Sequence, residues 1–159
     1  MDPLDPAQPG SHNLIIRNLR PDDLERIVRI DEEYVGRRRQ KWFEDKLARA
    51  LSGSALRVSL GAEIDGLLVG ALLGDMQYGE FGVPEPVAVL DTVVVDPAFR
   101  RQRVGAGMLQ QMVKNLAALR VTSIRTEVAW DELDLLGWFN SAGFRPVPRL
   151  VLELPVHSA

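Results

Sequence analysis

Hydrophobic and polar residues change their spacing several times along the chain, and each change predicts a different kind of element. Residues 87–95 are almost all apolar, which is typical of a central strand covered on both faces. After Val104, apolar residues instead recur at helical spacing between polar ones. The buried stripe predicted for this helix consists of Leu109, Met112, Val113, Leu116 and Leu119.

Turn signals place the remaining elements. Asp65-Gly66 separates two apolar runs and predicts a type I′ hairpin. The predicted strands cover residues 14–17, 58–64, 67–73, 87–95, 123–130 and 149–154. The predicted helices are one that opens at Pro21, one over 39–51, one over 104–119, and one capped by Asp131 that ends near residue 143. Because helix 104–119 connects two strands, it is expected to join them in parallel, which predicts an α/β fold with a central mixed sheet flanked by helices.

The sequence predicts a single folded domain. Residues 1–12 contain Pro3, Pro6, Pro9 and Gly10, and this composition is typical of a flexible leader. The remaining residues, 13–159, are enough for one hydrophobic core and show no internal repeat.

Composition limits the partners and the location of the protein. Its residues are 46% hydrophobic and 26% charged, as in ordinary globular proteins. The formal charge of −3 argues against non-specific nucleic-acid binding, which needs an excess of Lys and Arg. No apolar run approaches the roughly 20 residues of a membrane span, and the acidic, Pro-rich start is unlike a secretory signal. We therefore expect a cytoplasmic protein with no nucleic-acid or membrane partner.

Cysteine and histidine usage restricts the chemistry further. The chain has no cysteine, which excludes disulfides, zinc–thiolate sites and thiol nucleophiles. Its two histidines, His12 and His157, lie near opposite ends of the chain. We therefore expect neither a histidine-based triad nor a bound metal.

Residues 100–107 connect the predicted central strand to the helix after it and carry the strongest chemical signal. A helix start exposes unpaired N–H groups and a partial positive dipole, which together favour phosphate. Gly105 and Gly107 remove side chains where a ligand would approach the backbone, and Arg100, Arg101 and Arg103 add positive charge. The segment lacks the Lys-Ser/Thr ending of a P-loop and the glycine spacing of a dinucleotide fingerprint. It predicts pyrophosphate binding; the alternative is a solvated basic helix entry.

The segment from Val94 to Leu109 resembles the acetyl-CoA motif of the GNAT superfamily of N-acetyltransferases. That motif is an Arg or Gln, two variable residues, and then Gly-x-Gly or Gly-x-Ala. The hairpin at residues 64–70 and the segment at residues 138–144 also resemble the family's pattern. The order of predicted elements agrees with the family from about residue 13 to residue 154.

This resemblance implies the GNAT acyl-CoA N-acyltransferase fold and acetyl-CoA as co-substrate. In the family, the central strand pairs with the pantetheine arm, the loop after it holds the pyrophosphate, and an acceptor amine attacks the thioester directly. The cofactor-binding residues implied here are Val93, Val94, Val95, Arg100, Arg101, Gln102, Arg103, Val104, Gly105, Ala106 and Gly107.

Two positions depart from the family pattern. Arg103 stands at the first glycine of Gly-x-Gly, so its side chain must point away from the pyrophosphate or contact it. Phe139 stands where many members carry a tyrosine that protonates the leaving thiolate, and phenylalanine has no proton to give.

Carboxylates are the candidate bases for removing a proton from the amine, because no histidine is available. Asp91 lies on the central strand, and period-two alternation places it on the same side as Val93 and Val95. Glu127 lies within the strand predicted over 123–130. The alternative for Asp91 is a partnered polar residue, and for Glu127 a solvated or salt-bridged one.

The predicted function is transfer of an acetyl group from acetyl-CoA to a primary amine, which can belong to a small molecule, a peptide N-terminus or a lysine. The alternative is a catalytically silent acyl-CoA-binding sensor or scaffold. A phosphate-binding domain unrelated to CoA is a third reading. The resemblance also implies a homodimer, formed through the predicted last strand at residues 149–154.

Overall fold

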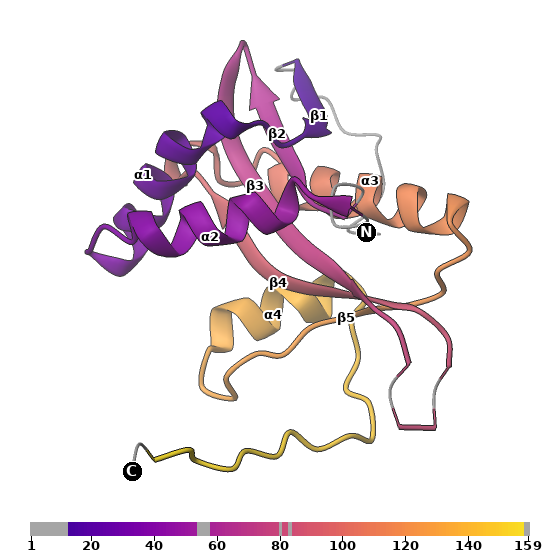
Figure 1. Ribbon diagram of the computed structural model, residues 1–159. Coiled ribbons are helices and arrows are strands. Elements are labelled where there is room, and N and C mark those ends of the chain that lie inside the picture. Colours follow the sequence, from indigo (N-terminus) through magenta and orange to yellow (C-terminus); the bar gives the residue numbers. More distant parts are fainter. Residues whose placement is uncertain (1–12, 54–57, 80, 83, 158–159) are drawn as a thin grey trace. The chain divides into compact units, whose positions relative to one another are not determined.

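The computed structural model describes residues 13–53, 58–79, 81–82 and 84–157 (Figure 1). The predicted leader over residues 1–12 lies outside this part of the chain. The chain divides into two compact units, Met1–Glu127 and Val128–Ala159. The predicted strand and loop of the acetyl-CoA motif both belong to the first unit.

The first unit contains a five-stranded sheet in the order β1-β2-β3-β4-β5. Neighbouring strands from β1 to β4 are antiparallel, whereas β4 and β5 are parallel, which confirms the predicted mixed sheet. The fifth strand is much shorter than the one predicted over residues 123–130. The strands are β1 Leu14–Asn18, β2 Leu60–Ile64, β3 Leu67–Gln77, β4 Val87–Val95 and β5 Ile124–Arg125.

The turn between β2 and β3 has the predicted type. Asp65 and Gly66 both have positive φ angles, 50° and 81°, as a type I′ turn requires. Strand β3 continues well beyond its predicted end at residue 73, because Gly74 pairs with Leu90 and the residues after it also pair with β4.

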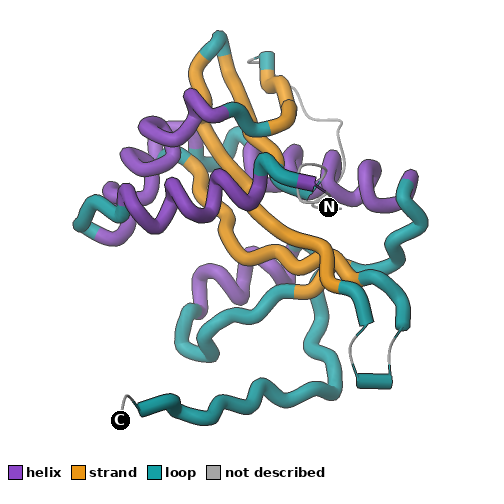
Figure 2. Tube along the Cα trace, in the orientation of Figure 1, coloured by secondary structure: helices purple, strands orange, loops and turns teal. Residues whose placement is uncertain are grey.

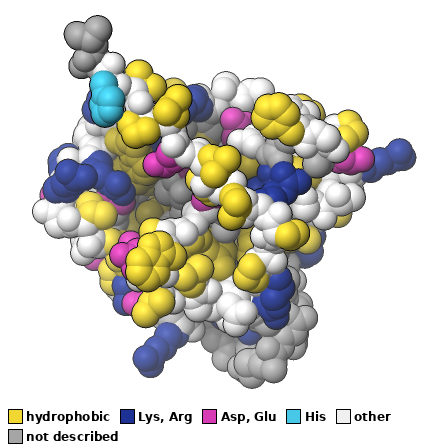
Figure 3. All heavy atoms as spheres, turned by 90° about the horizontal axis from the view of Figure 1, so that it is seen from below, with side chains coloured by type: hydrophobic (Ala, Val, Ile, Leu, Met, Phe, Trp, Pro, Cys, Tyr) yellow, Lys and Arg dark blue, Asp and Glu magenta, His cyan; other side chains and the backbone are white. Residues whose placement is uncertain are grey.

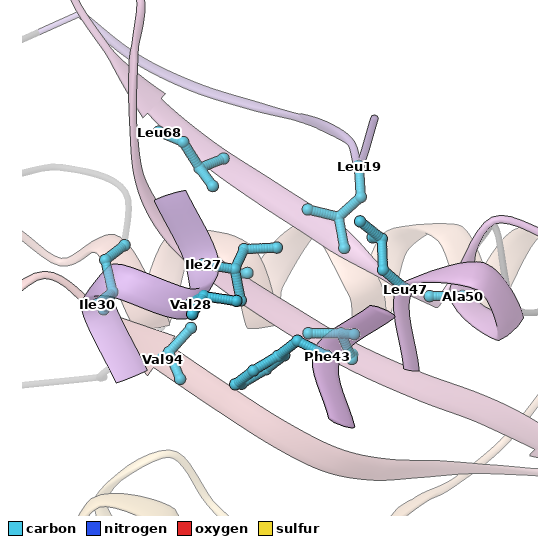
Figure 4. Packing of buried hydrophobic residues seen from close by; sticks show 11 residues of the cluster. Leu19, Ile27, Val28, Ile30, Phe43, Leu47, Ala50, Leu68 and Val94 are labelled. Atoms are coloured by element: carbon cyan, nitrogen blue, oxygen red, sulfur yellow. The ribbon is translucent and has the colours of Figure 1, made fainter. Parts of the chain in front are cut away.

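Helices cover both faces of the sheet. The helices are α1 Leu24–Val35, which follows a short 3₁₀ turn at Pro21–Asp23, α2 Gln40–Ala50, α3 Val104–Ala118 and, in the second unit, α4 Leu133–Ser141. Helices α1 and α2 lie on one face of the sheet and α3 on the other (Figure 1). Between α1, α2 and strands β3 and β4 lies a cluster of buried side chains (Figure 4), made of Leu19, Ile27, Val28, Ile30, Phe43, Leu47, Ala50, Leu68, Ala71, Leu73 and Val94.

Helix α3 packs so closely on the sheet that Gly70 of β3 needs to be glycine. A Cβ atom on Gly70 would lie 2.8 Å from Val104 Cγ1 and 3.1 Å from Met108 Cε. Three residues of the predicted stripe are buried, namely Leu109, Met112 and Leu116. The prediction is wrong for Val113 and Leu119, which are 42% and 38% exposed. Val113 lies outside the buried stripe of the helix, and Leu119 follows the helix end at Ala118.

A β-bulge interrupts the pairing of β3 with β4. Leu73 pairs with Thr92 and Gly74 with Leu90, so Asp91 is an extra residue without an opposite partner. A Cβ atom on Gly74 would lie 2.6 Å from the Val89 carbonyl oxygen. The bulge therefore depends on the absence of a side chain at Gly74.

The second unit contains α4 and an extended C-terminal segment. Helix α4 starts after Glu132, and no side chain caps it, so the predicted cap by Asp131 is wrong. Gly143 follows the helix end with a φ of 97°, consistent with the predicted end. The ring of Phe139 packs edge-on against those of Trp138 and Phe144.

The strand predicted over residues 149–154 is not formed. This segment is drawn as loop in Figure 2, because none of the described strands pairs with it. Leu150, Leu152 and Leu154 are each at least 86% exposed. Hydrophobic side chains are also widespread on the face of the molecule drawn in Figure 3. In the described part of the chain, none of the helices has the length and apolar character needed to cross a membrane.

We expect Gly74→Ala to destabilise the protein by about 1–3 kcal/mol, because the new methyl group must displace the backbone of Val89. Chemical denaturation monitored by circular dichroism measures this change. The matched control is Gly137→Ala in α4, where a Cβ meets no atom within 4 Å and helix propensity favours alanine. Equal stability of the two variants would contradict the close approach of β3 to β4.

Candidate functional site

One edge of β4 is unpaired over most of its length. The parallel ladder to β5 contains the pairs Ala88↔Ile124 and Val89↔Arg125, whereas β4 continues to Val95. Just past the ladder, Thr126 Oγ1 donates a 2.8 Å hydrogen bond to the Leu90 carbonyl. Beyond that bond, no described strand pairs with this edge of β4.

The backbone groups of Val93 and Val95 face this open edge. The N–H of Asp96 donates to the Val69 carbonyl of β3 at 2.8 Å, so the backbone of Asp96 faces β3. Successive residues of a strand turn their backbone groups to opposite edges, so Val95 and Val93 face away from β3 and Val94 faces it. Val93 and Val95, two of the residues predicted to bind pantetheine, therefore have their backbone groups at the open edge. The side chain of Val94, the third, is buried in the core.

The open edge leads to the start of α3 through a tightly held connection. Asp96 caps a 3₁₀ turn at Pro97–Phe99 by accepting a 2.8 Å hydrogen bond from the N–H of Ala98. Its other carboxylate oxygen forms an ion pair with Arg26 of α1, whose Nε also donates to the Leu68 carbonyl at 2.9 Å. The end of β4 is thus fixed to both β3 and α1.

The first turn of α3 has free backbone donors. The first hydrogen bond along the helix is the 2.9 Å bond from Gly107 N–H to the Arg103 carbonyl, and Arg103 provides no side-chain cap. Among the described residues, no acceptor is bonded to the N–H groups of Val104, Gly105 and Ala106. These donors and the helix dipole form a position suited to an anionic group.

Arg103 keeps the backbone conformation expected of the glycine that it replaces. Its φ is 59°, and that of Arg101 is 65°, both in the left-handed region that glycine adopts most easily. For other residues this conformation costs roughly 1–2 kcal/mol each. The departure from the family motif therefore changes the side chain at this position, while its φ stays in the range that glycine adopts most easily.

The other predicted loop residues differ in their surroundings. Gly105 is buried at the start of α3. A Cβ atom on Gly107 would lie 3.1 Å from Leu14 Cδ2, so this glycine allows α3 to pack on β1 and does not admit a ligand. Gln102 Oε1 is buried without a hydrogen-bond partner, which leaves an acceptor that a bound molecule or water can satisfy.

Asp91 faces α2, on the face of the sheet opposite to that occupied by the side chains of Val93 and Val95. Its Oδ1 accepts hydrogen bonds from Lys46 Nζ of α2 and from Thr92 Oγ1, both at 2.6 Å. The prediction that Asp91 lies on the same side as the two valines is wrong, because the bulge inserts one residue and reverses the alternation.

A small, open pocket lies beside Asp91. It is lined by Lys46, Arg49, Ala50, Leu73, Gly74, Asp75 and Asp91. The Lys46 ammonium also lies over the ring of Trp42, 4.5 Å from its centroid, and the Arg39 guanidinium lies 4.3 Å from the same centroid. A hydrogen bond to Asp31 raises the pKa of Arg39, which therefore stays charged. The lining of the pocket thus combines the carboxylates of Asp75 and Asp91 with the cationic side chains of Lys46 and Arg49.

The structure does not place Glu127 in this pocket. It lies beyond the short β5 and is exposed, whereas the sequence predicted it within a strand. Lys46, which lies beside Asp91 in this pocket, was not predicted from the sequence. Its position four residues after Trp42 in a predicted helix indicates the contact between these two side chains. Its contact with Asp91 depends on the bulge, which the sequence pattern did not predict. Among the described residues, no three or more Asp, Glu or His side chains are grouped to hold a metal ion.

Solved structures share this architecture at low sequence identity. Aminoglycoside antibiotic 6'-N-acetyltransferase AAC(6')-Ih from Acinetobacter baumannii is 16% identical with a TM-score of 0.75, and the match covers 92% of this chain and 100% of that one. Aminoglycoside N-acetyltransferase AAC(6')-Iy, solved in complex with CoA, is 15% identical with a TM-score of 0.74 over 94% and 99% of the two chains. A transcriptional regulator from Bacillus halodurans C-125 is 16% identical with a TM-score of 0.74 over 91% and 100%.

The sequence itself also matches a family model. No curated protein matches the sequence. The model of the Acetyltransferase (GNAT) family matches residues 20–144. This range includes strands β2 to β5, the start of α3 and helix α4, and it leaves out β1. The chain therefore belongs to the acetyltransferase (GNAT) family and is an acyltransferase.

Proposed function

We propose that this protein transfers an acetyl group from acetyl-CoA to a primary amine. The observation that carries the proposal is the open edge of β4, which ends at the free N–H groups of α3. An extended arm with amide groups can pair along such an edge, and a diphosphate suits the helix start. The CoA complex of AAC(6')-Iy, which has the same fold, supports acyl-CoA as the donor.

The donor end of the site uses backbone groups and arginines. Val93 and Val95 hold the pantetheine arm through their N–H and C=O groups. The N–H groups at the start of α3 hold the diphosphate, and Arg100, Arg101 and Arg103 add charge near it. Guanidinium groups suit this role because they stay protonated and present paired donors. Acetyl-CoA supplies the thioester-activated acetyl group.

The acceptor end of the site is the pocket beside Asp91. The nucleophile must be a neutral amine, so an ammonium acceptor has to lose a proton first. Lys46 and Thr92 hold Oδ1 of Asp91, and no described donor is bonded to Oδ2. In our proposal Oδ2 accepts this proton, with Glu127 as the second candidate base. Phe139 has no proton for the leaving sulfur, so this proton comes from solvent.

The donor assignment can be tested directly. We expect calorimetry to detect binding of acetyl-CoA, and a panel of aminoglycosides, polyamines, amino acids and lysine peptides to contain at least one acceptor that releases CoA thiol. A KM for acetyl-CoA between roughly 1 µM and 1 mM is typical of such enzymes. Gly137→Ala is the control variant.

Three outcomes would contradict this proposal in different ways. No detectable acetyl-CoA binding would exclude the donor. Binding without thiol release over the whole panel would favour the acyl-CoA sensor or scaffold. Equal affinity for simple nucleotides would favour a phosphate-binding domain unrelated to CoA.

We expect Asp91→Asn to lower kcat by about 100-fold or more, the usual range for loss of a general base, with little change in KM for acetyl-CoA. Steady-state kinetics with the best acceptor of the panel measures both. Asp45→Asn is the matched control, because Asp45 lies on the exposed face of α2 and forms an ion pair with Lys41 of the same helix. A loss of kcat in Glu127→Gln but not in Asp91→Asn would assign the base to Glu127, and unchanged kcat in both would exclude both.

We further propose that the protein is a homodimer formed through residues 149–154. The exposed leucines of this extended segment support the proposal, since a segment of this kind can add to the sheet edge of another copy. Size-exclusion chromatography with light scattering is expected to give twice the monomer mass. Leu152→Asp is expected to yield monomers and Glu153→Gln to leave the dimer intact; a monomeric wild-type protein at all concentrations would exclude the dimer.

A further inference from the structure

Tyr34 contacts both parts of the proposed donor site. It lies in the last turn of α1, and its hydroxyl donates a 2.5 Å hydrogen bond to the carbonyl of Val95 at the open edge of β4. Arg100 Nε donates to the same hydroxyl oxygen at 3.4 Å, and the Arg100 guanidinium carbon lies 5.1 Å from the centroid of the Tyr34 ring. One side chain therefore connects the strand edge to the first arginine of the loop.

Burial does not explain this arrangement. The Tyr34 side chain is 46% exposed, so water could satisfy its hydroxyl without the bond to Val95. The hydroxyl bonds to Val95 and Arg100 hold the ring at the end of α1, which terminates directly afterwards at Gly36 with a φ of 70°. An exposed aromatic ring held at a helix end is a fixed surface on which a guanidinium can stack.

We propose that Tyr34 is a positioning residue that holds Arg100 beside the open edge of β4 for the diphosphate of the acyl donor. This inference rests on the proposed function. A donor that runs from Val95 to the start of α3 passes the segment that carries Arg100. A free surface arginine must lose side-chain freedom when it binds an anion, whereas one already stacked and hydrogen-bonded loses less.

The ring and the hydroxyl of Tyr34 have separable effects. The ring stacks on the guanidinium and acts only on Arg100. The hydroxyl contacts both Arg100 and the Val95 carbonyl, which can still accept a second bond because a carbonyl oxygen has two lone pairs. Tyr34→Phe therefore removes the hydroxyl contacts alone, and Tyr34→Ala removes all of them.

Two acyl donors test the inference. Acetyl-CoA carries the diphosphate, whereas acetyl-pantetheine has the same thioester arm without it. We expect Tyr34→Ala to raise KM for acetyl-CoA roughly 5- to 10-fold, the lower end of the combined size of an exposed cation–π contact and a hydrogen bond. The values of kcat and of KM for acetyl-pantetheine are expected to stay unchanged, and Tyr34→Phe is expected to have a smaller effect on KM for acetyl-CoA.

A double-mutant cycle shows whether Arg100 carries the effect. Arg100→Gln is expected to raise KM for acetyl-CoA, and adding Tyr34→Ala to it is expected to have little further effect. Val35→Ala is the control, because it removes an exposed side chain from the same turn of α1. Thermal unfolding midpoints that match the wild type exclude a loss of fold as the cause.

The possible failures are distinguishable. If the wild type does not bind acetyl-CoA, the proposed function fails and this inference fails with it. If the wild type uses acetyl-CoA normally but Tyr34→Ala leaves its KM unchanged, only the role of Tyr34 is wrong. Equal losses with both donors, or additive effects of the Tyr34 and Arg100 substitutions, would also overturn the proposal, since the diphosphate would then not be the group affected.

Discussion

The β-bulge at Asp91 is the constraint on which the rest of the candidate site depends. A bulge bends its strand and increases the local twist, and the ladder between β4 and β5 ends at Val89, just before it. Beyond Leu90, none of the described strands pairs with that edge of β4. The same extra residue turns Asp91 toward α2 and Lys46. One inserted residue therefore creates both the unpaired edge and the carboxylate beside the pocket.

Residues distant in sequence hold the bulge in place. The Oγ of Ser59, which is completely buried, accepts a 3.1 Å hydrogen bond from the N–H of Gly74 and donates one of 3.1 Å to its carbonyl. The opposite side of Gly74 faces the Val89 carbonyl too closely for a side chain. Both polar groups of this glycine are thus satisfied without pairing across the bulge, so the irregular register leaves no buried polar group of Gly74 unpaired.

The sequence predicted those elements whose signal is local. The apolar run of β4, the helical spacing of α3 and the Asp65-Gly66 turn each predicted the observed structure, because neighbouring residues determine them. The face of Asp91 was predicted wrongly, because period-two alternation holds only in a strand without insertions. The signal for the bulge was Gly74, which directly follows the predicted end of the strand over residues 67–73. Residues 123–130 and 149–154 have suitable residues for strands, but a strand also needs a partner, and propensity does not supply one.

The loop before α3 places two arginines in backbone conformations that glycine adopts most easily. Arg101 and Arg103 both adopt left-handed conformations, at a cost that two glycines would avoid. The connection from β4 is independently anchored, since Arg26 of α1 holds Asp96 and Asp96 in turn accepts from Ala98. Strained residues persist where the surrounding structure fixes the path of the chain and where their side chains contribute to function. On the proposed function, that contribution is positive charge beside a diphosphate. Arg26 also neutralises Asp96, the carboxylate at the entrance to this loop, so the charge of the loop arginines is not offset there.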